Sequence, residues 1–106
     1  MTIENMDDLI ALVKQTLGIV ETATAKDGEL EMLITAGVDD MERAGVDVDT
    51  TNALVQKAIL TYVKANFGIS NPTDKEKFLK SYQLCLAELS LSEGYKKEDG
   101  DAGLDN

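Results

Sequence analysis

The chain has 106 residues, enough for one domain built on a single modest core. Its formal net charge of −10 argues against tight, direct DNA binding, which relies largely on lysine and arginine displacing phosphate counterions. The chain has no histidine, which removes the commonest general base and transition-metal ligand, and its single cysteine, Cys85, rules out an intrachain disulfide.

Two helices are predicted in the first half of the chain. Residues 5–17 form the first, with Asn5 as its N-cap and Gly18 as the residue that ends it. A loop over residues 19–26 leads to the second helix, residues 27–44, which Asp27 caps and Gly45 follows. Gly37 interrupts the apolar stripe of this helix, either to let another helix approach closely or because a glycine is simply tolerated there. Residues 46–49 are expected to form an extended connector.

Two further helices are predicted in the second half. Residues 50–67 form the third, capped by Asp49 or Thr50, and this helix is apolar on nearly every side. The fourth begins at Asn71 and Pro72 and runs to about Leu89. The residues expected to be mostly buried in the assembled state are Leu54, Ile59, Tyr62, Phe78, Tyr82, Cys85 and Leu89.

These elements predict a compact, all-α domain of four helices over residues 1–92. Residues 93–106 are rich in Gly, Asp and Glu and have little to bury, so this acidic tail is expected to be flexible and disordered in isolation. There is no signal peptide and no apolar run long enough to cross a bilayer, which predicts a protein made in a cytoplasm.

The apolar third helix has two interpretations. In the first it is a central helix wrapped by the other three. In the second a neighbouring subunit covers part of it, because apolar area left on a helical domain usually marks an interface. The residues that would form this interface are Leu54, Val55, Leu60, Val63 and Phe67.

No pattern indicates an enzyme, a cofactor or a metal. The paired acids at Asp7–Asp8 and Asp39–Asp40 are sequence neighbours and do not share a helix face. Asp47 and Asp49 have the first spacing of a calcium loop, but the glycine and bidentate glutamate of that loop do not follow. No serine stands in the Asp-Ser-Leu context of an acyl carrier protein. We therefore expect no catalytic, cofactor-binding or metal-binding residues.

Four segments carry a resemblance to a known family: MDDLIALVKQTLGI, LEMLITAGVDDMERAGV, ALVQKAILTYVKANFG and NPTDKEKFLKSYQLCLAELSLS. Together they resemble the small head-tail connector proteins of tailed bacteriophages, also labelled DNA-packaging or portal adaptor proteins. The resemblance covers residues 5–92. Its most specific parts are packing and capping signals, namely the block from Tyr62 to Gly68, the Asn71–Pro72 start and the segment 89–92.

The resemblance implies a non-enzymatic, all-helical structural protein of the virion, assembled in the host bacterial cytoplasm and located at the head-tail junction. It implies a ring of about twelve copies beneath the portal protein. The ring would extend the DNA channel and dock the next head-completion or tail protein, without contact to a membrane. The tail after residue 92 has no counterpart in the resemblance.

An acidic surface would let DNA slide through such a channel without specific binding. The acids expected to face the channel are Asp39, Asp40, Glu42, Asp47 and Asp49. The alternative from another class is a small acidic helical module that binds one protein partner, or regulates it, as a monomer or dimer. A closed ring would favour the connector, and a strict monomer with a fully buried third helix would favour the module.

Overall fold

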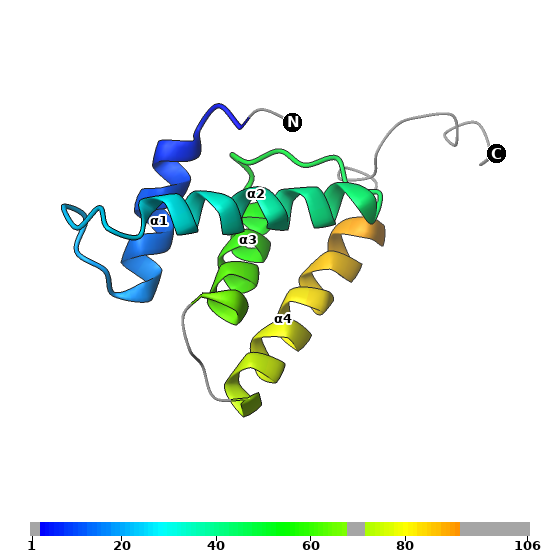
Figure 1. Ribbon diagram of the computed structural model, residues 1–106. Helices are drawn as coiled ribbons and strands as arrows, with labels where there is room; N and C mark the ends of the chain where they lie inside the picture. The colour runs from blue at the N-terminus through cyan, green and yellow to red at the C-terminus, as the bar shows by residue number, and fades with distance from the viewer. Residues whose placement is uncertain (1–2, 68–71, 92–106) are drawn as a thin grey trace.

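The computed structural model describes residues 3–67 and 72–91 and contains four helices in this part of the chain (Figure 1). They are α1 (Met6–Leu17), α2 (Asp27–Arg43), α3 (Ala53–Asn66) and α4 (Pro72–Leu91). No strand occurs among these residues, so the predicted all-α, four-helix fold is confirmed. The predicted domain boundary at residue 92 and the predicted tail, residues 93–106, lie outside the described residues.

The third helix is central. It packs against each of the other three, with α4 running alongside it and α2 lying across it (Figure 1). An apolar stripe that covers most of a helix needs neighbours on most sides. The interpretation of a central helix wrapped by the other three therefore holds within one subunit.

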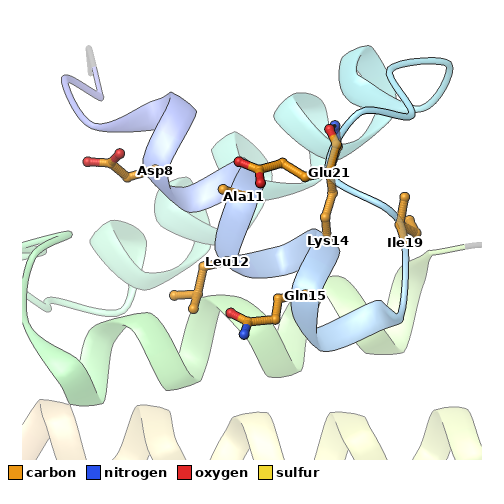
Figure 2. Close-up of a pocket in the computed structure, with 7 residues that line it drawn as sticks. All are labelled: Asp8, Ala11, Leu12, Lys14, Gln15, Ile19 and Glu21. Carbon is orange, nitrogen blue, oxygen red and sulfur yellow. The ribbon is translucent and has the colours of Figure 1, made fainter.

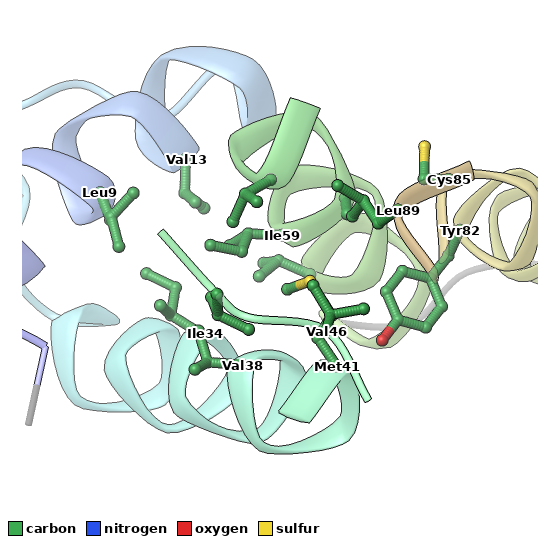
Figure 3. Packing of buried hydrophobic residues seen from close by; sticks show 14 of the residues in the cluster. Leu9, Val13, Ile34, Val38, Met41, Val46, Ile59, Tyr82, Cys85 and Leu89 are labelled. Atoms are coloured by element: carbon green, nitrogen blue, oxygen red, sulfur yellow. The ribbon is translucent and has the colours of Figure 1, made fainter. Parts of the chain in front are cut away.

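The core draws apolar side chains from all four helices and from the connector before α3 (Figure 3). In the connector, Val46 and Val48 are buried while Asp47 and Asp49 are exposed. This alternation is that of extended chain, whose side chains point to opposite sides in turn, and it confirms the predicted extended connector. Each fully buried aliphatic side chain contributes about 1.5–3 kcal/mol relative to exposure. The side chains buried almost completely are Leu9, Val13, Leu30, Ile34, Val38, Met41, Val46, Val55, Ile59, Val63 and Leu89.

Four of the seven side chains expected in the core are buried in the single subunit: Ile59, Tyr82, Cys85 and Leu89. The other three, Leu54, Tyr62 and Phe78, are half-buried. The Phe78 ring is partly covered by a cation, because the Lys64 ammonium lies 4.8 Å from its centroid.

The starts of two helices differ from the prediction. Asn5 precedes α1 but its side chain does not cap it. Asn5 Oδ1 instead accepts a hydrogen bond from the Thr50 hydroxyl at 2.6 Å, and its amide donates to the Thr50 carbonyl oxygen at 3.1 Å. These two bonds tie the start of α1 to the connector.

Asn52 is the cap of α3. Its Oδ1 accepts hydrogen bonds from the backbone N–H groups of Leu54, at 2.9 Å, and Val55, at 3.3 Å. The prediction of Asp49 or Thr50 as the cap was therefore wrong, and α3 begins at Ala53 rather than at residue 50. Asp49 makes a local turn instead, in which its carboxylate accepts from the Thr51 hydroxyl and backbone N–H.

The two interpretations of Gly37 are now distinguished. A Cβ atom at this position of α2 would lie 3.0 Å from Cδ1 and 3.2 Å from Cγ of the Tyr62 ring on α3. The absence of a side chain at Gly37 therefore lets the Tyr62 ring of α3 pack directly against α2, and the close-approach interpretation holds. Gly18 and Gly45 have φ values of +77° and +91°, as expected of residues that end helices in the left-handed conformation.

Candidate functional site

A shallow hollow of about 480 Å³ lies against α1 and the loop that follows it (Figure 2). The residues that line it are Asp8, Ala11, Leu12, Lys14, Gln15, Ile19 and Glu21. Figure 2 shows the Lys14 side chain extending from α1 toward the loop, whereas Leu12 and Gln15 point away from it. The hollow would need Lys14 as a free cation to bind or activate a ligand.

Lys14 is not free. It is 4% exposed, and its ammonium donates to the Glu21 carbonyl oxygen at 3.1 Å and lies 2.7 Å from Asp27 Oδ1. Asp27, predicted to cap α2, is instead its first residue and pairs with this cation. The sequence offers one signal for this role, because position 14 follows Ile10 by one helical turn and so borders the apolar stripe. Lys14 therefore fastens the loop and the start of α2 to α1.

Nothing in the described residues forms a metal site. Within 3–67 and 72–91, no group of three or more Cys, Asp or Glu side chains is placed to hold an ion. Cys85 is 3% exposed, and burial raises the pKa of its thiol, so the thiol stays protonated at neutral pH. Cys85 is thus a core residue, as predicted. No helix in this part of the chain has the length and apolarity needed to cross a bilayer.

Tyr82 links α4 to α2. Its hydroxyl donates to Asp40 Oδ2 at 2.6 Å, and its ring meets that of Tyr62 edge-on with centroids 5.2 Å apart. Arg43 lies 3.8 Å from the other oxygen of Asp40. Burial, and then the hydrogen bond to the Asp40 carboxylate, raise the pKa of Tyr82 far above its ordinary value. The arrangement is structural, because a phenol held neutral in this way is neither a base nor a nucleophile.

This bond predicts a loss of stability at alkaline pH. An unfolded tyrosine releases its proton near pH 10, whereas folded Tyr82 keeps its own, so above about pH 10 the folded state holds more protons and its stability falls as pH rises. Tyr82→Phe should make this fall shallower and cost about 1 kcal/mol at neutral pH. Chemical denaturation at pH 7 to 11 measures both effects, and identical alkaline slopes for the two proteins would contradict the assignment.

The predicted interface residues of α3 differ in how deeply they are buried. Val55 and Val63 are fully buried within the subunit, so no neighbour can reach them in this conformation. Leu54, Leu60 and Phe67 are half-buried at the edge of the core. An interface over α3 stays a prediction for these three alone.

The large apolar side chains that are most exposed lie elsewhere: Val20, Met32, Leu84 and Leu91. Leu84 and Leu91 are 69% and 78% exposed and, with Ala87 between them, occupy one side of α4. Their spacing of three and four residues puts them on a single stripe. This second apolar stripe was not predicted from the sequence. The buried seam of α4 already explained why the helix contains many apolar residues.

The predicted channel acids do not share one environment. Asp40 is directed toward Tyr82. Asp39 and Glu42 are half-exposed on α2, and Asp47 and Asp49 are exposed on the connector. The hydrogen bonds from the Thr51 hydroxyl and backbone lower the pKa of Asp49, which keeps this carboxylate charged.

Charge is divided unevenly between the two halves of the chain. Residues 1–52 contain twelve acids and three basic residues, whereas residues 53–91 contain five lysines and three acids. The region of α1, α2 and the connector is therefore strongly negative, and the region of α3 and α4 is weakly positive.

Comparison with known proteins gives one match. A family model described as phage connector protein matches residues 9–96, which span most of α1 and all of α2, α3 and α4. No curated protein and no solved structure matches the chain.

Proposed function

Because the chain belongs to the phage connector protein family, as the match over residues 9–96 shows, we propose that it forms a closed ring beneath the portal of a filled bacteriophage capsid. The ring has about twelve copies, extends the DNA channel and docks the next head-completion or tail protein. The protein acts as a structural component of the virion and not as an enzyme.

The family match carries this proposal, because it spans most of α1 and all of the other three helices rather than one motif. Large exposed apolar residues on α2 and α4 support it, since such residues usually mark contacts with other proteins when they gather in one place. The side chains that could otherwise take part in chemistry are engaged in contacts within the subunit. They are Lys14, Tyr82 and Cys85.

The direct test is to mix the purified full chain with portal rings of the phage that encodes it and to weigh the complexes by native mass spectrometry. We expect the portal to bind a complete set of about twelve copies, with few partially filled species, because a ring gains its last contacts only on closure. A chain that stays monomeric or dimeric and does not bind the portal would contradict the connector and favour the small interaction module.

For the channel wall we propose the acids that remain exposed on the connector, Asp47 and Asp49. A negative wall gives phosphates no attractive contact, so DNA passes without being held. The expected result is no binding of the assembled ring to duplex DNA at micromolar concentration and physiological salt. Micromolar affinity, or a ring structure with a mainly basic lumen, would contradict this wall.

A further inference from the structure

Two outward helix faces of the subunit are complementary in charge. We define the α4 face as Lys77, Lys80, Leu84, Ala87, Glu88 and Leu91, all of which are exposed. Its first part is basic and its last part is apolar apart from Glu88, and it lies opposite the seam of Tyr82, Cys85 and Leu89 that packs into the core.

The second face lies on α2 and forms a shallow hollow. We define the α2 face as Gly28, Glu31, Met32, Thr35, Ala36 and Asp39, the residues that line it. Met32 is 68% exposed, and small side chains around it leave room for a protruding residue. Glu31 and Asp39 place acids on the face.

We propose that the α4 face of one subunit docks on the α2 face of the next copy and that this contact builds the ring. The inference rests on the proposed function and names the two surfaces that the ring uses. Subunits with a net charge of −10 repel one another, so their contact is favoured where a basic face meets an acidic one. The α4 face supplies two lysines and one carboxylate, and the α2 face supplies two carboxylates.

The two faces also match in length when the helices run antiparallel. Lys80 and Leu91 are eleven residues apart on α4, as are Asp39 and Gly28 on α2, which corresponds to about 16 Å along each helix. With Lys80 opposite Asp39, Leu91 comes opposite Gly28 and Ala87 opposite Met32. In this register both lysines lie within one helical turn of Asp39 and the apolar ends of the two faces coincide, whereas Glu31 comes opposite Glu88.

In the ring the contact is head-to-tail: each subunit uses its α4 face on one neighbour and its α2 face on the other. A contact of this kind leaves one free α4 face and one free α2 face on every pair, so assembly continues until the ring closes.

Charge reversal tests the pairing. We expect Lys77→Glu/Lys80→Glu and Asp39→Lys each to raise the concentration needed for assembly on the portal by at least about tenfold, because like charges then meet. Mixed in equal amounts, the two variants should assemble again as an alternating ring, since each face finds an opposite charge on its neighbour. The control Lys26→Glu/Lys57→Glu makes the same change in net charge as Lys77→Glu/Lys80→Glu at residues outside both faces and should assemble like the wild type.

A matched pair of single variants tests the apolar part of the α4 face. Leu84→Ser should weaken assembly, whereas Val20→Ser, at a side chain of nearly equal exposure outside both faces, should not. Normal assembly by the charge-reversed variants, or no recovery in their mixture, would overturn the proposed faces and leave the connector function intact. Failure of the wild type to bind the portal would overturn the function instead.

A second measurement does not depend on the portal. A carbodiimide joins lysine amines to carboxylates in direct contact, and mixing isotope-labelled with unlabelled full chain separates links between copies from links within one. At high protein concentration we expect links from Lys77 or Lys80 to Asp39 between copies. Links between copies that involve other residues alone, or no such links, would overturn the proposed faces.

Discussion

Leu89→Ala should lower the free energy of unfolding by about 2–5 kcal/mol, the range for a leucine removed from a closely packed core. Leu89 is fully buried and belongs to the seam through which α4 joins the core (Figure 3). The truncation removes apolar burial and leaves a cavity that the surrounding helices fill only in part. Urea denaturation at a protein concentration that keeps the chain monomeric measures the change.

The same helix provides the control. Leu84→Ala and Leu91→Ala make the identical chemical change at side chains that are 69% and 78% exposed. Their unfolding free energies should stay within about 0.5 kcal/mol of the wild type. Equal losses at Leu84 and Leu89 would mean that the buried and exposed sides of α4 are wrongly assigned.

Lys14→Met should cost about 1–3 kcal/mol of stability, because it removes the cation from Asp27 and the donor from the Glu21 carbonyl oxygen. Among the described residues, Asp27 Oδ1 has no hydrogen-bond donor besides this ammonium. A buried acceptor left without its partner bears the full cost of its lost hydration. The length of the methionine side chain preserves most of the packing along α1.

Lys26→Met is the matched control. Lys26 is exposed and its nitrogen lies 3.9 Å from Glu29, a surface pair that contributes little, so we expect a change below about 1 kcal/mol. Adding Asp27→Leu to Lys14→Met should recover part of the loss, since both partners are then apolar. Equal effects of the two lysine substitutions in thermal or urea unfolding would contradict the structural role of Lys14.

The helices themselves could be predicted because their signals are local. Apolar side chains recur at the helical period, and Gly18, Gly45 and Pro72 mark ends that the structure also has. The observed bounds differ from the predicted ones by three residues at most. The largest error is the start of α3, which follows four polar residues in a row, 49–52, that could each cap a helix. The long-range bonds from Asn5 to Thr50 hold this stretch against the start of α1, and no local pattern contains those bonds.

Residues whose roles depend on which helices meet could not be predicted. The pairing of Tyr82 with Asp40 joins α4 to α2, and Lys14 reaches residues seven and thirteen positions along the chain. Asp40 had been expected to face the channel, but its environment is set by the packing of α4. The same holds for Val55 and Val63, which a subunit interface was expected to cover and which the subunit's own helices enclose.

The connector function is tested most directly in the phage that encodes the protein, by deleting its gene and examining lysates by electron microscopy. The account predicts capsids and tails that accumulate separately, and joined particles once the purified full chain is added back. Added Leu84→Ser protein should restore joining less well than added Val20→Ser protein. Normally joined, infectious particles in the absence of the protein would contradict the account.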